Sequence, residues 1–462
     1  MITAPLIVFL AMLSLILQKY LKLPSSIWLM SLGFLLMLFF PELSLFEVNQ
    51  EQFSKTLLAF LPILLMADVM EIHISEFKKH AISIFLLAVV AVIMSVLLGM
   101  AISDWVFDGH NMGTGEIIFT YIACFATDPV AVVAIFSMFV LPSALKTLVE
   151  GESLINDGTA VTIAVYLALP LMVGDVLTVS GFSITAFAVI LGSLLVGAIF
   201  AFLGFFLLMV KENPIWQLGS WLLVGLVSFG VAENFYLFIN FIFHSHSHFH
   251  LSGIVAVISS IFIVKILLGK ADDLLHKNIS IQEKRIQNST DLTSPERKNV
   301  MISVLEKNII ERANSENIKQ NIQFLALMAN TVLFIYLGEL LLVNYDLMIK
   351  YSDVIIKMVL ATLIIRGFLM GVIAFISNKS EKLVNIPFHW WVVLTFVGFQ
   401  GGLSIVLSSL VPETTLNYDV IKAVILGNIV LSTFINAIVL IIYINIKKDL
   451  FIKEAEADLN NH

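Results

Sequence analysis

The stretch "EGESLINDGTAV", residues 150–161, places several polar side chains inside an otherwise apolar part of the chain. On a helix, Glu152 and Asn156 lie about 40° apart, and Ser153 and Asp157 form a second pair with the same separation. The four side chains therefore share one polar face. Removal from water favours the protonated form of a lone carboxyl group. A carboxylate beside other oxygen ligands also suits a hard cation, so this face predicts a site where a proton and a monovalent cation compete.

A second polar interruption, "FATDPVAV", precedes it at residues 125–132. Pro129 has no backbone N–H, and its ring disfavours helical backbone at Asp128. We therefore expect the span to break near Thr127 and to free carbonyl and hydroxyl oxygens in the membrane. Na⁺ and Li⁺ bind to oxygen ligands of this kind.

One arginine also lies within apolar sequence. The chain has four arginines, and the three others (Arg285, Arg297 and Arg312) belong to the polar stretch 270–320, whereas Arg366 lies in "VLATLIIRGFLMGVIAF". A guanidinium is always charged and needs a partner in lipid. We predict that Glu152 pairs with Arg366, which leaves Asp157 to carry the exchangeable ion.

The composition describes the elements that must position these residues. Of 462 residues, 59% are hydrophobic and only 13% are charged, whereas soluble domains carry about 25% charge; the mean hydropathy is +0.97. We predict an all-α polytopic membrane protein with about thirteen transmembrane helices. The expected spans lie near residues 2–18, 25–41, 56–70, 81–102, 115–140, 150–173, 182–210, 215–232, 251–269, 321–343, 351–377, 388–411 and 419–446.

With these thirteen spans, the lysines and arginines of the loops fall mainly on one side of the membrane. One side of the membrane receives most of the loop lysines together with the stretch 270–320 and the C-terminal tail, and the other side receives mainly Lys55, Lys350 and Lys422. The positive-inside rule then places the N-terminus outside and the C-terminus in the cytoplasm.

A second interrupted span is expected where "VGFQGGLSIVLSSL" contains Gly398, Gly401 and Gly402. Two interrupted helices at matching positions indicate inverted repeats around a transport site. We divide the chain into a first repeat of six spans (1–173), a linking span (174–214), a second repeat (215–446) and a short cytoplasmic tail (447–462). The insert 270–320, with Pro295 as a helix breaker, is expected to be a solvated cytoplasmic linker, with room for short amphipathic helices.

These motifs resemble the monovalent cation:proton antiporter-1 family, which includes bacterial NhaP-type antiporters and animal sodium/hydrogen exchangers. The resemblance rests on "TDPVAV", "GESLINDGTA", the arginine in a later span, "FHLSGIVAV" and "FLALMANTVLFIYLG". It covers the whole membrane region. It implies an NhaA-like fold with crossed, broken helices, a homodimer, and electroneutral exchange of Na⁺ or Li⁺ for H⁺.

The resemblance also implies residue roles. Na⁺ would bind at Asp157, Thr127 and Ser153, and Asn156 would order this site. Asp128 would offset the dipoles of the half-helices. Beside these, Glu152 would pair with Arg366, and the Asn-Asp pair at 156–157 resembles the electroneutral branch of the family.

Two positions depart from the family pattern. Where the family often reads Leu-Leu-Phe-Glu-Ala-Gly-Leu, this chain has "LLMADVM" at residues 64–70. Ala67 stands where the family has the acid. Either the next residue, Asp68, takes over its role from a different face of the helix, or the acid is lost. Gln400 in "GFQG" stands where the family carries a cation in Gly-Leu-Arg-Gly, which predicts an altered pH response or ion selectivity.

A third departure is the stretch containing "HSHSHFH" between Glu233 and the Ser-Gly pair at 252–253, because the family's acid lies only a few residues before that pair. On an extended strand, alternating histidines (His244, His246, His248 and His250) lie on one face. Such a face can hold Zn²⁺ or respond to external pH. The alternative is a loop without a measurable role.

We expect a secondary antiporter in which Na⁺ or Li⁺ competes with H⁺ at Asp157. A K⁺/H⁺ or mixed Na⁺/K⁺ antiporter of the same fold is the alternative, and a non-transporting sensor is a further one because of Ala67 and Gln400. The chain has no His-Glu-x-x-His or Gly-x-Ser-x-Gly motif of an enzyme. We expect no cofactor and no nucleic-acid partner, and a location in the plasma membrane, which is the inner membrane in a bacterium.

Overall fold

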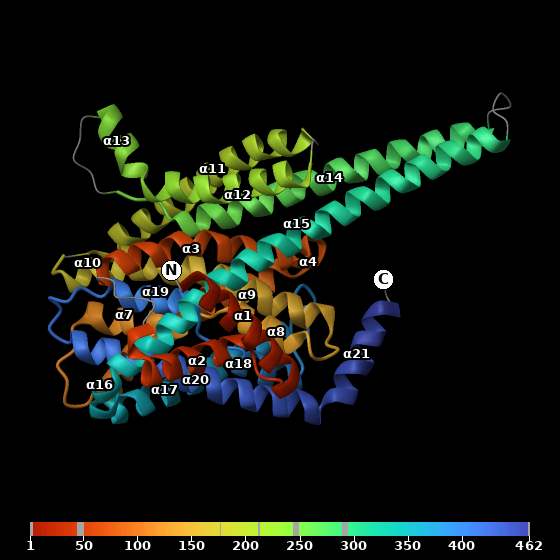
Figure 1. Ribbon diagram of the computed structural model, residues 1–462. Coiled ribbons are helices and arrows are strands. Elements are labelled where there is room, and N and C mark those ends of the chain that lie inside the picture. Colours follow the sequence, from red (N-terminus) through yellow and green to blue (C-terminus); the bar gives the residue numbers. More distant parts are fainter. Residues whose placement is uncertain are drawn as a thin grey trace. The chain divides into compact units, whose positions relative to one another are not determined.

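The computed structural model describes residues 3–43, 50–175, 177–210, 213–243, 249–288 and 294–460 (Figure 1). These residues form helices joined by short turns, and no strand occurs among them. Nine helical segments within this described part are long and apolar enough to cross a membrane. The prediction of an all-helical polytopic membrane protein is confirmed.

The chain forms two compact units. Unit 1 comprises Met1–Leu64, Glu71–Val189 and Leu327–His462, and unit 2 comprises Leu65–Met70 and Ile190–Ala326. Three helices have residues in both units: α3 (Gln50–Glu71), α11 (Val179–Met209) and α15 (Ser294–Val343). Unit 2 also contains α12 (Pro214–Glu233), α13 (Phe235–Phe243) and α14 (Gly253–Asn288).

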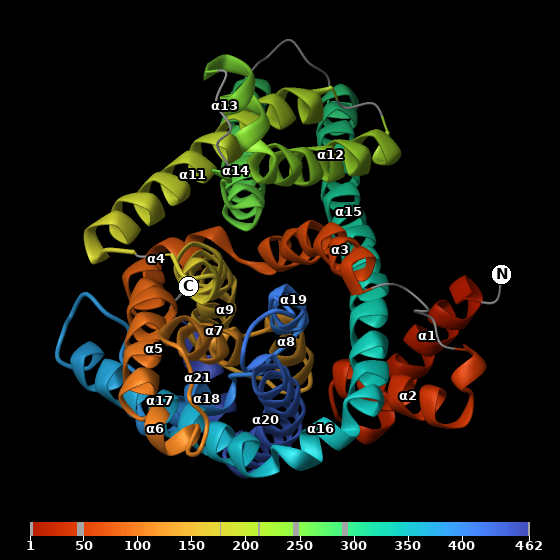
Figure 2. The same cartoon turned by 90° about the vertical axis from the view of Figure 1, so that its left-hand side faces the viewer.

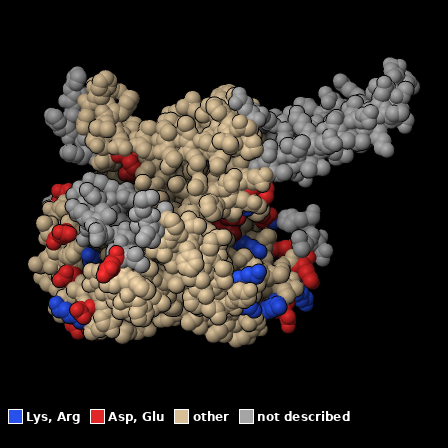
Figure 3. All heavy atoms as spheres, viewed as in Figure 1, with Lys and Arg blue, Asp and Glu red and all other residues tan. Residues whose placement is uncertain are grey.

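Unit 1 contains the remaining helices. They are α1 (Thr3–Leu21), α2 (Ser25–Phe39), α4 (Ile74–Phe85), α5 (Ala91–Ala101), α6 (Ser103–Val106), α7 (Thr114–Phe125), α8 (Pro129–Phe136), α9 (Ser143–Ile163), α10 (Leu169–Met172), α16 (Tyr345–Lys350), α17 (Ser352–Ser377), α18 (Phe388–Phe396), α19 (Gly402–Leu410), α20 (Tyr418–Ile446) and α21 (Lys448–Asn460). On the face of unit 1 shown in Figure 3, charged side chains gather towards two opposite ends and uncharged residues cover the space between them.

Two spans of unit 1 are interrupted, as the sequence predicts. The first ends as α7 at Phe125 and resumes as α8 at Pro129, with Asp128 extended between them. The second ends as α18 at Phe396 and resumes as α19 at Gly402. Figure 2 shows both interrupted spans together with α9 and α20 inside unit 1. Proline explains the first interruption, and the glycine-rich link explains the second.

Close helix packing in unit 1 depends on a pair of glycines. A Cβ on Gly33 of α2 would lie 2.3 Å from the Ile335 carbonyl oxygen, and a Cβ on Gly338 of α15 would lie 2.3 Å from the Met30 carbonyl oxygen. Each helix backbone therefore touches the other at a residue without a side chain. Small residues commonly allow such contact between membrane helices, where packing replaces the hydrophobic effect as the driving force.

The described residues of the stretch 270–320 are helical. α14 continues to Asn288 and α15 begins at Ser294, so both spans extend as long helices into this stretch (Figure 1). Pro295 lies in the first turn of α15, where a missing N–H breaks no helical hydrogen bond. The prediction that Pro295 breaks a helix was wrong, because a proline in the first turn does not end the helix.

Candidate functional site

The first interruption exposes backbone carbonyls, and α9 supplies donors for two of them. The Asn156 amide Nδ2 donates to the Phe125 carbonyl at 2.9 Å, and the Ser153 hydroxyl donates to the Thr127 carbonyl at 2.9 Å. The last carbonyls of a helix have no partner within it, and burying them without one is costly. α9 therefore stabilises the break.

The second interrupted span supplies the other two donors. The Gln400 amide Nε2 donates to the Cys124 carbonyl, and the Ser404 hydroxyl donates to the Ala126 carbonyl at 3.4 Å. The Asp128 amide N–H, in turn, donates to the Phe399 carbonyl at 2.7 Å. Each interrupted span thus donates hydrogen bonds to the other at its break, and these bonds hold the two breaks together.

Neutral oxygen and nitrogen atoms meet at the first break. The Thr127 and Ser153 hydroxyl oxygens are 3.1 Å apart, and the Asn156 Nδ2 donates to the Thr127 hydroxyl at 3.0 Å. All three residues are buried. The structure therefore brings together three of the four residues predicted to form or order the ion site, and hydroxyl oxygens so placed suit a hard monovalent cation.

Asp157, the fourth, follows Asn156 on α9 and is only 5% exposed. It lies four residues after Ser153, so both side chains project from the same part of the helix surface. A buried carboxyl group on this face has two chemical uses. It can hold a proton, and, ionised, it can balance the charge of a cation bound by the neighbouring hydroxyl oxygens.

The predicted ion pair forms in unit 1. The Arg366 guanidinium donates from Nη1 and Nη2 to the two carboxylate oxygens of Glu152, at 3.2 and 3.1 Å. Its Nε donates to the Leu394 carbonyl in α18 at 3.1 Å. Parallel hydrogen bonds of this kind are the strong, geometrically specific form of an ion pair. Arg366 therefore links α9 of the site to the second interrupted span.

Asp128 lies where the two half-helices begin. Its Oδ1 accepts the Val130 N–H at 2.8 Å and caps α8, which starts with Pro129. Its Oδ2 lies beside Gly401, the residue before α19, where an added Cβ would come within 1.8 Å of that oxygen. Helix N-termini carry partial positive charge, so a buried carboxylate between two of them is well placed electrostatically.

Replacing Gly401 with Ala is expected to disrupt this arrangement. The new methyl group would overlap the Asp128 carboxylate, and overpacking of this kind costs about 1–3 kcal/mol. We expect a lower unfolding temperature. Gly402→Ala is the matched control, because its nearest neighbours are the flexible ends of Leu333 and Leu64, at 3.1 and 3.4 Å. Equal effects of both substitutions would contradict the role given to Gly401.

Sequence reasoning missed three polar residues that hold the second break. They are Ser404, which bonds to Ala126; Asn436, whose Nδ2 donates to the Gly398 carbonyl at 3.0 Å; and Thr433, whose hydroxyl lies 3.5 Å from the Gln400 carbonyl. Each interrupts an apolar run ("GLSIVLSSL" and "LSTFINAIV"), and that interruption was the available signal. Uncharged polar residues are common in membrane helices, so the signal was weak.

Asp68 and its neighbours belong to unit 2, in the segment Leu65–Met70 of α3. Also in unit 2, the Lys265 ammonium donates to the Val69 and Met70 carbonyls at 2.8 and 3.0 Å. Lys265 therefore lies at the end of α3, where a cation interacts favourably with the helix dipole.

The histidine stretch is described only in part. His244, His246 and His248 lie outside the described residues, while the His250 Nδ1 lies 2.7 Å from the Glu233 carbonyl oxygen. The Glu233 carboxylate accepts a hydrogen bond from the Gly253 N–H at 2.9 Å. The acid therefore contacts the Ser-Gly pair at 252–253 although many residues separate them in the sequence. Within the described part of the chain, no three metal-binding side chains cluster.

Comparison with known sequences identifies relatives. The family model "Sodium/hydrogen exchanger, transmembrane" matches residues 6–238, half of the chain. The Na⁺/H⁺ antiporter NhaP of Pseudomonas aeruginosa is 27% identical over 248 residues, which cover 50% of this chain and 57% of that protein. The Na⁺/H⁺ antiporter NhaH of Halobacillus aidingensis is 29% identical over 256 residues, 53% and 59% of the two chains. The match thus spans less than two thirds of each relative.

Comparison with solved structures covers nearly the whole chain. The sodium proton antiporter MjNhaP1 of Methanocaldococcus jannaschii, at pH 8, superposes with a TM-score of 0.67 over 98% of this chain and 99% of that one. The sequence identity is 15%, so this likeness concerns the fold.

Proposed function

Because the chain belongs to the sodium/hydrogen exchanger family, we propose that it is a secondary antiporter that exchanges Na⁺ for H⁺ across the membrane. The observation that carries this proposal is the buried face of α9, where the Thr127 and Ser153 hydroxyls meet at a helix break beside Asp157. Oxygen ligands and a carboxyl group at one place suit an ion and a proton in turn.

In the mechanism that we propose, Asp157 binds either a proton or Na⁺, and Li⁺ is accepted likewise. Thr127 and Ser153 provide neutral ligands, and Asn156 holds Thr127 in position. Because one site serves both ions and the protein changes its access only when the site is occupied, one cation is exchanged for one proton. Transport is then electroneutral and is driven by whichever gradient is larger.

The wider architecture belongs to the same proposal. We propose thirteen spans arranged as two inverted repeats, residues 1–173 and 215–446, joined by the span within 174–214. The protein would be a homodimer in the plasma membrane, which is the inner membrane in a bacterium. Its N-terminus would be outside and its C-terminus, with the tail 447–462, in the cytoplasm.

The proposal is tested in liposomes that contain the protein, an acidic interior and a pH-sensitive dye. External Na⁺ or Li⁺ is expected to make the interior alkaline, without dependence on membrane voltage. A response to K⁺ of equal size would favour the K⁺/H⁺ or mixed Na⁺/K⁺ antiporter, because cavity size decides between these ions. No response to any cation, in folded protein, would favour a membrane sensor that does not transport.

Competition at one carboxyl group makes a further prediction about pH. The apparent KM for Na⁺ is expected to fall as pH rises, by up to about tenfold per unit while the carboxyl group is mainly protonated. The maximal rate at saturating Na⁺ should change much less. The measurement is the initial rate of dye response against Na⁺ concentration at several pH values. A KM that does not vary with pH would indicate separate binding sites for the two ions.

A further inference from the structure

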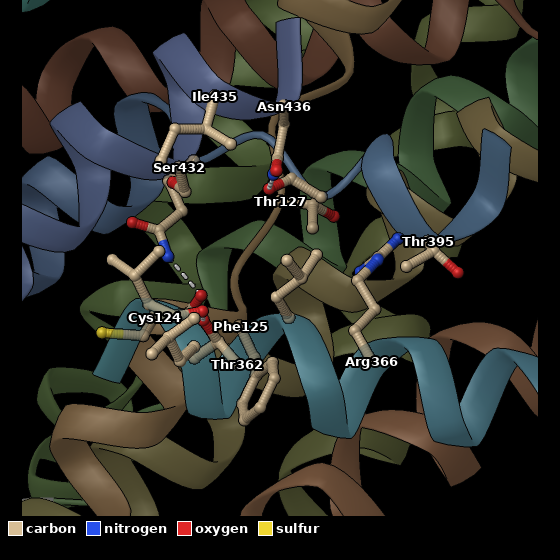
Figure 4. A pocket seen from close by; sticks show the side chains of 14 residues that line it. Cys124, Phe125, Thr127, Thr362, Arg366, Thr395, Ser432, Ile435 and Asn436 are labelled. Carbon is tan, nitrogen blue, oxygen red and sulfur yellow. Dashed lines mark hydrogen bonds between the residues drawn. The ribbon is translucent and has the colours of Figure 1, made fainter. Parts of the chain in front are cut away.

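Unit 1 contains a cavity of about 160 Å³ behind the ion site, which we call the α17–α20 cavity (Figure 4). Its walls come from α7, α17, α20 and the link between α18 and α19. In Figure 4, Ser432, Ile435 and Asn436 of α20 lie on one side, with Cys124 and Thr362 across from them. Asp157 and Ser153 are not among the lining residues.

Hydrogen-bond acceptors lie in the wall of the cavity. The Thr362 hydroxyl donates to the Val359 carbonyl at 3.0 Å, and the Asn436 Nδ2 donates to the Gly398 carbonyl at 3.0 Å. The Thr362 hydroxyl proton and one of the two Asn436 amide protons are therefore engaged within the protein. The remaining hydroxyl lone pairs and the Asn436 Oδ1 can accept a hydrogen bond. A ligand that donates a hydrogen bond therefore finds an acceptor here.

The charged group of the cavity is already neutralised. Arg366 lines one end, but its guanidinium makes both hydrogen bonds to Glu152 and one to the Leu394 carbonyl. A cation would meet this guanidinium, and an anion would compete with a bidentate carboxylate. An uncharged ligand meets neither penalty.

The mouth of the cavity is apolar. Leu360 of α17 is 46% exposed and Ile435 of α20 is 40% exposed, and both are lining residues within spans that are apolar enough to cross a membrane. A ligand would therefore enter from the lipid or detergent phase. The cavity also limits the size of the ligand, because a cavity of about 150 Å³ accommodates a molecule of about the size of benzene.

We propose that the α17–α20 cavity binds a small uncharged molecule that has one hydrogen-bond donor, of the class of the aromatic alcohols. The ring would contact Val359, Leu363 and Ile435, and its hydroxyl would donate to Thr362 or Asn436. Binding does not depend on the proposed function. A ligand here would lie against Thr127 and Gln400, so it would also resist movement of the two breaks and slow the proposed exchange.

Cys124 provides a direct test, because it is the only cysteine of the chain and it lines the cavity. The purified protein in detergent is treated with methyl methanethiosulfonate, a small neutral thiol reagent, and the adduct is quantified by mass spectrometry. Benzyl alcohol is expected to slow the reaction in a saturable manner. Toluene, which has the same ring and no donor, should bind about fivefold more weakly, the effect of one hydrogen bond.

Two substitutions on α20 locate the entrance. Ile435→Trp places a large side chain at the mouth and is expected to slow modification of Cys124 about tenfold, as closure of an access path would. Ile438→Trp, at a 47% exposed position on the same helix, is outside the lining and should leave the rate unchanged. Unfolding temperatures of both variants show whether they fold.

The outcomes separate the possibilities. Folded protein in which benzyl alcohol does not slow the reaction of Cys124 would overturn the proposal. Equal protection by toluene and benzyl alcohol would overturn its hydrogen-bonding part. Protection without inhibition of Na⁺/H⁺ exchange would retain the binding site and remove the effect on the breaks. If wild-type liposomes show no exchange at all, the proposed function fails while the protection assay still decides the binding.

Discussion

Asp157→Asn is expected to reduce Na⁺-dependent proton flux in liposomes about 100-fold or more, to the level of liposomes without protein. The amide has nearly the shape of the carboxylate but cannot bind a proton at neutral pH, and it carries no charge to balance a cation. The Thr127 and Ser153 hydroxyls would remain in place. Flux of Na⁺, Li⁺ and K⁺ should be lost together, because the carboxyl group serves every transported ion.

The control for this substitution is Asp353→Asn in α17, the same chemical change at a side chain that is 64% exposed. It should leave the flux close to wild type. The unfolding temperature of Asp157→Asn shows whether the variant folds. A folded Asp157→Asn protein with normal flux would exclude Asp157 as the ion-carrying residue.

Breaking the Glu152–Arg366 pair is expected to have the largest effect on stability. Glu152 is 1% exposed and Arg366 is 8% exposed, so either residue alone leaves a buried charge without its partner. Removing one member of a buried pair costs about 3–5 kcal/mol. Glu152→Gln should be the worse single change, because a guanidinium cannot lose its proton, whereas a carboxyl group left by Arg366→Leu can take one up.

A double-mutant cycle measures this coupling. The free energy of unfolding is determined in mixed micelles for Glu152→Gln, Arg366→Leu and both together. The double variant should be more stable than Glu152→Gln, since no uncompensated charge remains. Arg366→Leu should gain stability as the pH is lowered, while Glu152→Gln should not. Independent, additive effects of the two substitutions would contradict the pairing.

The exposed pair Asp353–Lys357 on α17 is the matched control. Its atoms lie 3.8 Å apart, and the two side chains are 64% and 27% exposed. Exposed pairs of this kind contribute about 0–1 kcal/mol. Asp353→Asn should therefore change the free energy of unfolding several-fold less than Glu152→Gln does.

Parts of the site could be predicted because local rules decide them. Pro129 has no backbone N–H and disfavours helical backbone at Asp128, so a break near Thr127 could be predicted from the local sequence. The same holds for the polar face of α9, which follows from helical spacing alone. The pairing of Glu152 with Arg366 was also accessible, because a buried guanidinium requires an acid and few acids lie within apolar sequence.

Other parts depended on which helices become neighbours. Periodicity indicates the polar face of a helix, but it does not identify the helix opposite that face. The donors for the freed carbonyls come from residues up to 278 positions away, as in the bond from Ser404 to Ala126. For the same reason the sequence showed Glu233 as separated from Gly253, although a hydrogen bond joins them.

By itself the sequence determined that this chain is a helical membrane protein, where two of its spans break, and which charged groups must be buried. These properties follow from hydropathy and from the backbone chemistry of proline and glycine, which act within a few residues. Only the tertiary structure decided how each freed carbonyl is satisfied, that residues 270–288 and 294–320 are helical, and that a cavity lies beside Thr127. These depend on contacts between distant segments, and local sequence does not encode which segments meet.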